Sequence, residues 1–267
     1  MRSDSGGLKQ SSHRPLRLTS WNLLNGRSLI DGNADSETLA HGVGRFFEEF
    51  TPDLLAIQEV DDLQPRSGGI HQTRVIAELM GSDYWHYQPT LFGTPGGEWS
   101  TTQKEKSPTY GIALISRIEV KEFHIKELGT APCGAPLAIP TERGIRIRYV
   151  PDEPRVVIAA ELIDGTIVAA THLSFVPGFN IKQLRAAERW LRTLGKRVIL
   201  MGDFNLPWGL ASKATPLETL TQSKSYPSWS PKVQFDYILA SRGIEGREIV
   251  HGQAKISDHR PISAVIE

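Results

Sequence analysis

The sequence predicts a single α+β domain in which apolar strands are covered by helices. Short apolar runs of strand length recur along the whole chain, and amphipathic runs of helical period lie between some of them. No repeat, low-complexity block or linker divides the 267 residues. Layered folds rich in strands reach about 250 residues as one domain. Hydrophobic residues make up 39% and charged residues 22%, which excludes a disordered chain and a collagen-like repeat.

Residues 1–14 are polar and rich in Ser and Gly, so we expect a disordered tail followed by one domain over residues 15–267. The tail lacks the apolar core of a signal peptide, and no run approaches the 18 apolar residues that a membrane span needs. The single cysteine, Cys133, excludes an intramolecular disulfide. These features together predict a cytoplasmic protein.

The first half of the domain reads as two strands and two helices. Leu16 to Asn22 alternates apolar and polar residues, which predicts a half-buried strand. A helix capped within Asn33 to Ser36 follows, and its apolar face consists of Leu39, Val43, Phe46, Phe47 and Phe50. After a break at Pro52, Leu54 to Val60 predicts a buried strand that ends in polar residues, and Thr73 to Met80 predicts a second helix.

The segment from Tyr84 to Tyr110 reads as a long loop because Gly, Pro, Ser and Thr dominate its second half. It also carries several aromatic residues. Loops of this length in compact domains are either mobile or functional. Both interpretations stay open, the first as a surface insertion and the second as a rim that contacts substrate.

The second half predicts six strands and one helix. The helix is capped by Asn180 and ends at Gly195. The strands are expected at Gly111–Ser116, Val156–Leu162, Ile167–Leu173, Val198–Gly202, Phe235–Ala240 and Ile262–Ile266.

Polar residues capable of chemistry come at the ends of these strand patterns. They are Asn22, Glu59, His172, Asp203, Asn205, Asp236, Asp258 and His259. Strand ends that gather at one rim of a sheet are a common position for binding groups. If these residues converge, four carboxylates and two amides supply hard oxygen ligands that suit Mg²⁺ or Mn²⁺. A hard cation beside histidines and a carboxylate base suits attack of water on a phosphoester.

Each residue alone also has an ordinary structural explanation. Asn22, Asp203 and Asp258 are residue types common in turns. Glu59 can face solvent at a strand end, and His172 can be a buried, hydrogen-bonded histidine. The ordered series favours the functional interpretation.

Seven motifs occur in order from about Leu16 to Ile266: Ser20-Trp21-Asn22, Ala56-Ile57-Gln58-Glu59, Tyr110 to Arg117, Thr171-His172-Leu173, Met201-Gly202-Asp203-Phe204-Asn205, Phe235-Asp236-Tyr237-Ile238 and Ser257-Asp258-His259-Arg260-Pro261. This series resembles the endonuclease/exonuclease/phosphatase superfamily. The resemblance implies a four-layered α/β/β/α sandwich of two packed mixed β-sheets flanked by helices. It also implies a divalent-metal-dependent phosphoester hydrolase.

The resemblance implies a role for each residue. Glu59 is similar to the principal metal ligand, and Asn22 and Asp258 to neighbours that support the metal or its water. Asp203 matches the residue that orients the attacking water, and Asn205 its partner. His259 matches the histidine that stabilises the transition state, Asp236 the carboxylate that orients it, and His172 a second group that contacts phosphate. Arg143 matches loosely a phosphate-binding arginine, and a solvated strand-edge arginine is the alternative.

The substrate depends on loops that these motifs do not cover. The first interpretation is a phosphodiesterase that acts on a small or lipid phosphodiester. A net charge of zero, from 30 basic and 30 acidic residues, favours it over a duplex binder. The segment Ser225 to Pro231 resembles a stretch in uncharacterised bacterial members, although it also reads as a proline-rich turn.

The second interpretation is a DNA endonuclease or exonuclease similar to the AP endonucleases. Basic residues that could contact DNA are Arg143, Arg146, Arg148, Lys182, Arg185, Arg189 and Arg192, of which the last four share one predicted helix. The third is a catalytically idle binding protein with the same fold, which the intact series disfavours.

Overall fold

The structure is a computed structural model that describes residues 14–102, 107–141 and 144–267. The polar tail over residues 1–13 and Arg143 therefore lie outside the described residues. Arg14, the last residue of the expected tail, forms an ion pair with Asp53, with 3.1 Å between Nη2 and Oδ1. Within the described residues, no helix is both long and apolar enough to cross a bilayer.

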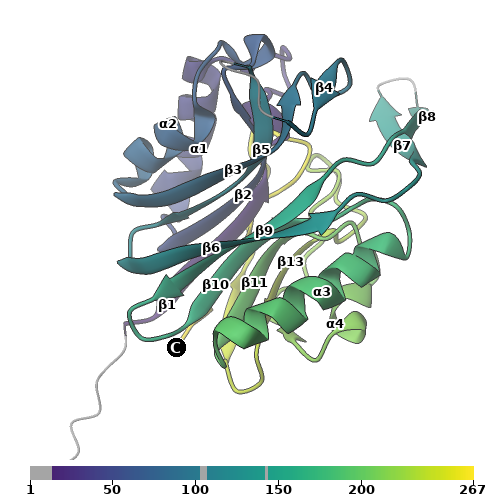
Figure 1. Cartoon of the computed structure of the whole chain (residues 1–267). Coiled ribbons are helices and arrows are strands. Elements are labelled where there is room, and N and C mark those ends of the chain that lie inside the picture. Colours follow the sequence, from purple (N-terminus) through teal and green to yellow (C-terminus); the bar gives the residue numbers. More distant parts are fainter. Residues whose placement is uncertain (1–13, 103–106, 142–143) are drawn as a thin grey trace, which may run out of the picture.

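Two mixed β-sheets form the centre of the molecule (Figure 1). The first sheet has the order β14 (Gly246–Ile249), β15 (Ile262–Ile266), β1 (Leu16–Asn22), β2 (Leu54–Asp62), β5 (Thr109–Ser116), β3 (Tyr84–Gly93) and β4 (Trp99–Ser100). The second sheet has the order β12 (Glu218–Thr219), β13 (Asp236–Ala240), β11 (Val198–Asp203), β10 (Ile167–His172), β9 (Arg155–Leu162) and β6 (Val120–Gly129). The neighbours β1 and β2 are parallel, as are β10 and β11.

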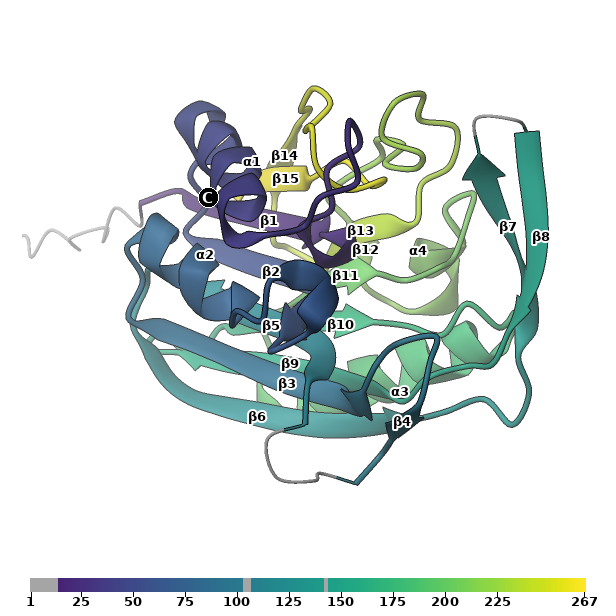
Figure 2. The ribbon, with the colours of Figure 1, turned by 90° about the horizontal axis from the view of Figure 1, so that it is seen from above.

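Helices cover the outer face of each sheet, as Figure 2 shows. The first sheet packs against α1 (Ser36–Glu49) and α2 (Gln72–Met80), and the second against α3 (Phe179–Leu194) and α4 (Leu210–Ala214). Two short 3₁₀ turns, η1 (Leu24–Gly26) and η2 (Pro65–Ser67), follow β1 and β2. The predicted α+β fold class and the four-layered sandwich are both confirmed.

Strand alternation divides the core into three layers. Along β1, β10 and β11, one set of alternate residues packs between the two sheets, and the other set packs against the helices. On β11, for example, Ile199 and Met201 lie between the sheets, whereas Leu200 contacts the helical layer. The side-chain direction at the end of each strand is therefore fixed by burial along its whole length.

The prediction of a long loop over Tyr84 to Tyr110 is wrong for its first ten residues, and its residues 103–106 lie outside the described residues. Tyr84–Gly93 forms β3, which pairs antiparallel with β5, and the Gly-rich stretch is the turn between β3 and the short β4. Pro89 lies at a register shift of the β3–β5 ladder, a position where a proline, which has no backbone N–H to donate to the ladder, is tolerated. The glycines therefore mark a tight turn inside a hairpin rather than a structureless segment.

Asn180 does not cap the helix as predicted. The N-cap is Gly178, and Asn180 lies in the first turn of α3, where its side chain accepts a hydrogen bond from the Gly178 N–H and donates one to the Asn205 carbonyl. Gly195 ends the helix as predicted. The basic residues Lys182, Arg185, Arg189 and Arg192 are exposed on the outer face of α3, which is the ordinary solvated arrangement.

A hairpin of β7 (Ala135–Thr141) and β8 (Gly144–Val150) forms a separate two-stranded sheet. Figures 1 and 2 both show it standing away from the two main sheets. It lies between β6 and β9 in the chain. Because β9 begins at Arg155, beside the end of β10, the hairpin projects at the end of the sandwich where β10 finishes.

Candidate functional site

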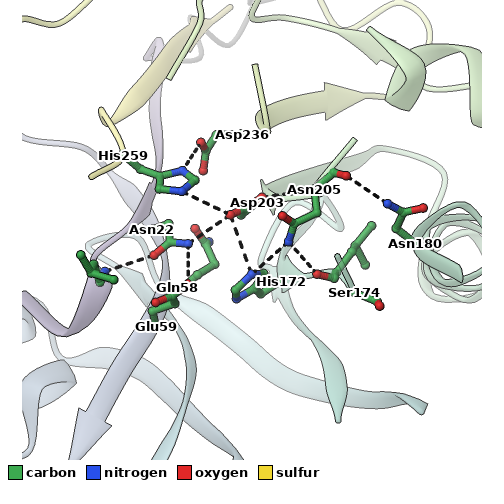
Figure 3. Close-up of polar contacts among 12 residues, drawn as sticks. Asn22, Gln58, Glu59, His172, Ser174, Asn180, Asp203, Asn205, Asp236 and His259 are labelled. Atoms are coloured by element: carbon green, nitrogen blue, oxygen red, sulfur yellow. Dashed lines mark hydrogen bonds and ion pairs between the residues drawn. The ribbon is translucent and has the colours of Figure 1, made fainter. Parts of the chain in front are cut away.

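The strand-end residues of the sequence meet at one end of the space between the two sheets (Figure 3). Asn22, His172 and Asp203 each continue the set of alternate residues that packs between the sheets, and each is the last residue of its strand. Asp236, at the start of antiparallel β13, is paired in register with Asp203. The rule that places Met201 in the core therefore places Asp203 at the rim, directed toward the opposite sheet.

Glu59 reaches the same rim through a β-bulge. Leu55 and Ile57 face the helical layer, and simple alternation would send Glu59 the same way. The register of β2 against β5 shifts between Gln58 and Val60, so that Val60 takes the helical side instead. Glu59 has a φ of 57°, and its Oε1 accepts a hydrogen bond of 3.0 Å from Asn22 Nδ2. The bulge thus turns one carboxylate out of the core and into the site.

Asp203 lies at the centre of the contacts that Figure 3 draws. Its Oδ1 accepts the Asn205 backbone N–H at 2.9 Å, and its Oδ2 accepts Asn22 Nδ2 at 3.1 Å. The same Oδ2 lies 3.8 Å from Nε2 of His172 and 3.8 Å from Nε2 of His259. Burial and the nearby charge of Asp236 raise the pKa of Asp203 to about 6. At neutral pH it is therefore an anion that two polar donors hold in place.

His259 is held by a buried carboxylate. Its Nδ1 is 2.7 Å from Asp236 Oδ2, and the Ser225 hydroxyl donates to the same oxygen. The Tyr226 ring packs on the imidazole with 4.9 Å between centroids. Burial alone would lower the pKa of His259, but the charge and hydrogen bond of Asp236 outweigh it and raise the pKa well above its usual value. His259 is therefore positively charged at neutral pH, with Nε2 as the nitrogen nearest Asp203.

His172, unlike His259, is uncharged at neutral pH. Burial, with the nearby charges of Arg155 and His259, lowers its pKa well below the usual value, so the ring is neutral. Asn205 Nδ2 donates to the Leu173 carbonyl at 3.0 Å, which fixes the orientation of this amide. The same nitrogen is 3.3 Å from His172 Nε2, which is therefore the acceptor, with the ring proton on Nδ1.

Glu59 and Asp258 are the two carboxylates that the sequence analysis expects to hold or support a metal. Burial raises the pKa of both, to about 7 for Glu59, and the charge of Asp258 is the next cause of the rise at Glu59. A divalent cation close to Glu59 would favour its charged form. The Asn22 oxygen accepts the Leu24 N–H at 3.1 Å, so the amide supports Glu59 rather than opening its oxygen to the rim. Asp203, Asp236 and His259 also lie close enough together to be compatible with metal binding.

Several residues of the site were not predicted from the sequence. Ser225 and Tyr226 contact Asp236 and His259, and Asn180 donates to the carbonyl of Asn205. Of these three, only Ser225 and Tyr226 lie in a segment that the sequence analysis singled out for its resemblance to bacterial family members. Arg155 is 5% exposed at the start of β9, and its Nε has no hydrogen-bond partner among the described residues. Thr171 pairs with Val157 in the β9–β10 ladder, which brings Arg155 level with the rim. An arginine just before an apolar strand run was a signal of the same kind as those used for the carboxylates.

A comparison with family models matches residues 19–259 to the Endonuclease/Exonuclease/phosphatase family. A search of curated proteins found no match. Among solved structures, an endonuclease/exonuclease/phosphatase from Beutenbergia cavernae DSM 12333 is 17% identical, with a TM-score of 0.62 over 95% of this chain and 72% of that one.

Two further structures share the fold at similar identity. A mannosyl-6-phosphatase from Bacteroides thetaiotaomicron VPI-5482 is 15% identical, with a TM-score of 0.60 over 94% of this chain and 99% of its own. The human Nocturnin catalytic domain with bound sulfate is 19% identical, with a TM-score of 0.56 over 96% of this chain and 94% of its own. Because the family model covers most of the chain and the fold agrees, this chain belongs to the endonuclease/exonuclease/phosphatase family.

Proposed function

We propose that the protein is a divalent-metal-dependent phosphodiesterase that cleaves a P–O bond by in-line attack of water. Family membership supports a phosphoester hydrolase. The observation that carries the finer proposal is the position of Asp203, a buried carboxylate with a charged histidine and a neutral histidine each 3.8 Å from the same oxygen. This arrangement provides a base and a charge stabiliser around one point.

Glu59 and Asp258 are the proposed metal ligands, and Asn22 orients Glu59 through its hydrogen bond. Carboxylate oxygens are suitable ligands for Mg²⁺ and also for Mn²⁺. When bound, the cation would neutralise phosphate charge and stabilise the leaving oxygen. The repulsion between the two carboxylates gives the chain a reason of its own to bind a cation at this point.

Asp203 is the proposed residue that orients and deprotonates the attacking water. Its contacts with Asn205 and Asn22 restrict its rotation, so the oxygen nearest the histidines stays directed into the rim. A pKa of about 6 lies near the operating range that a general base needs. The Asn205 backbone therefore acts on Asp203, while its side chain fixes His172.

His259 is the proposed donor to the phosphate oxygens, with Asp236 as the residue that keeps it charged. His172, through the ring proton on Nδ1, and Arg155, whose charge acts on His172, are proposed to contact phosphate. Arg155 is buried beside the end of β10, and its Nε has no hydrogen-bond partner among the described residues, while its Nη2 lies 3.9 Å from Asp152 Oδ1 and 3.8 Å from Glu153 Oε2. A guanidinium in that position can form paired hydrogen bonds to a phosphate.

The test is hydrolysis of bis(p-nitrophenyl) phosphate with Mg²⁺, with Mn²⁺ and with EDTA, beside the monoester p-nitrophenyl phosphate. We expect metal-dependent cleavage of the diester and a loss on the order of 10² to 10⁴ in rate for D203N. A loss below about tenfold in D203N would contradict the role of Asp203. Cleavage of the monoester alone would make the protein a phosphomonoesterase.

A nuclease remains the second candidate. It is favoured by Arg146 and Arg148, which are exposed on the hairpin that projects beyond the rim. Metal-dependent nicking of supercoiled plasmid, abolished in D203N, would establish it. We also propose a cytoplasmic location, which the single cysteine favours.

A further inference from the structure

The rim around the site carries large apolar side chains that face solvent. Monomeric soluble proteins place such residues singly, and a concentration of them marks an interaction surface. Six of those in the described residues lie on segments that follow or border the site strands: Ile30, Leu63, Ile147, Tyr149, Trp208 and Trp229. We call these six residues the rim patch.

Trp208 is the most exposed member, at 80%, and lies three residues after Asn205. Five residues separate it from Asp203 and span at most about 18 Å of backbone, so this indole lies on the loop that leaves the proposed catalytic carboxylate. The backbone before it is anchored, because Asn180 Nδ2 donates to the Asn205 carbonyl and Tyr237 Oη to the Leu206 carbonyl. Trp208 has a φ of 56°, a left-handed conformation that is rare for a bulky residue. The loop thus holds a large apolar side chain in water at a fixed place.

Trp229 and Ile30 are tied to the turn that carries Asp258. Trp229, which is 47% exposed, follows Ser228, whose N–H donates to the Asp258 carbonyl at 2.7 Å. Ile30, which is 77% exposed, follows Leu29, whose N–H donates to the Lys255 carbonyl at 3.0 Å. Both side chains therefore lie on backbone that is hydrogen-bonded to the site.

The β7–β8 hairpin supplies apolar and basic residues together. On β8, Ile147 and Tyr149 share one face and are 71% and 61% exposed. Arg146 and Arg148 share the other face and are also exposed. Both views of the fold place the hairpin at the end of the sandwich where the site lies (Figures 1 and 2).

We propose that the rim patch docks on the surface of a phospholipid bilayer and brings a lipid headgroup phosphodiester to Asp203. This rests on the proposed phosphodiesterase function. Tryptophan and tyrosine favour the headgroup level of a bilayer, aliphatic side chains enter the acyl boundary, and arginine binds lipid phosphates. The isoleucines distinguish this partner from a nucleic acid, because an aliphatic side chain offers no ring on which a base can stack.

The test measures co-sedimentation of the full chain with vesicles of phosphatidylcholine, alone and mixed with phosphatidylglycerol. The double variant W208S/I147S removes two rim residues from separate segments, the loop after β11 and strand β8. The matched control is I163S, since Ile163 is 63% exposed in the turn between β9 and β10, at the opposite end of the strands. Melting temperatures check that each variant is folded.

We expect wild type and I163S to bind vesicles alike, and W208S/I147S to bind at least about tenfold more weakly. Equal binding by all three, or no binding by wild type, would overturn the proposal. So would salt-dependent binding of wild type to single-stranded DNA, weakened in W208S/I147S, without vesicle binding.

The D203N variant separates this proposal from the proposed chemistry. Asp203 is 2% exposed and does not belong to the rim patch. D203N should keep wild-type vesicle affinity while losing hydrolysis. An inactive wild-type protein that still binds vesicles through the rim patch would refute the phosphodiesterase and leave the docking surface standing.

Discussion

Replacing Asp236 by Asn tests whether the charge on His259 drives the reaction. Asn has the shape of Asp and can still accept a hydrogen bond from Nδ1, but it carries no charge. The pair is buried, with Asp236 fully shielded and His259 6% exposed, and the two atoms are 2.7 Å apart. A hydrogen bond between charged partners contributes about 1.5–3 kcal/mol. The expected fall in kcat for the diester is therefore about 10- to 150-fold.

The pH profile separates this effect from simple structural damage. In wild type, Asp236 holds the pKa of His259 well above its usual value, so the rate should stay level through neutral pH as His259 keeps its proton. In D236N the burial of His259 is less opposed, its pKa falls, and the alkaline decline of kcat moves to lower pH. The assay is kcat for bis(p-nitrophenyl) phosphate over a pH series at saturating metal.

Ser225→Ala provides the control. It removes a hydroxyl that donates to Asp236 and leaves the carboxylate charge in place. We expect less than about a tenfold loss and an alkaline decline at the wild-type position. The reasoning fails if D236N declines at the wild-type pH, or if S225A shifts the decline as far as D236N does.

Three further predictions follow from the geometry. Burial raises the pKa of Glu59 from 4.5 to about 7, so the metal-free folded protein keeps a proton that the unfolded chain has lost. The contribution of Glu59 to the free energy of unfolding therefore falls as the pH rises from 4.5 to about 7. Urea unfolding over this pH range should show a smaller decrease in the free energy of unfolding for E59Q than for wild type. Equal decreases in the two proteins would contradict this prediction. A Cβ on Gly202 would lie 2.0 Å from the Thr171 carbonyl oxygen, so G202A should lower the unfolding free energy by more than about 2 kcal/mol, and an unchanged urea midpoint would count against the close approach. M201A and L200A should each lower the free energy of unfolding by about 2–5 kcal/mol. M201A should lower kcat more than L200A, because Met201 lies on the face of β11 that ends in Asp203. Equal kcat values in the two variants would contradict a link between the inter-sheet core and the site.

Much of the fold and the site could be predicted because burial leaves a direct record in the sequence. Buried strands such as Val198–Asp203 are continuous apolar runs, and the first polar residue after each run marks the rim. This signal located His172 and Asp203, the end of an alternating strand pattern located Asn22, and the structure brings the three together. Arg155 carried this signal at the start of a strand instead of its end, and the search for strand ends passed over it.

The features that escaped prediction depend on contacts between distant segments. The strand over Tyr84–Gly93 has mostly half-buried residues, so it lacks an apolar run, and its pairing with Thr109–Ser116 is what defines it. Asn180 has the residue type of a helix cap, but the carbonyl of Asn205, 25 positions away, takes its side chain. Local patterns cannot record a partner of this kind.

The bulge at Glu59 explains why the site needs both sheets. Asn22 donates to Glu59 on its own sheet and to Asp203 on the other, so one amide joins the proposed metal ligand to the proposed base. Without the extra residue in β2, alternation would bury Glu59 under the helices and leave Asn22 with Asp203 alone. The distance between the proposed metal ligand Glu59 and the proposed base Asp203 is thus set by how the two sheets pack, and not by either sheet by itself. The inter-sheet core therefore serves stability and the geometry of the candidate site at once.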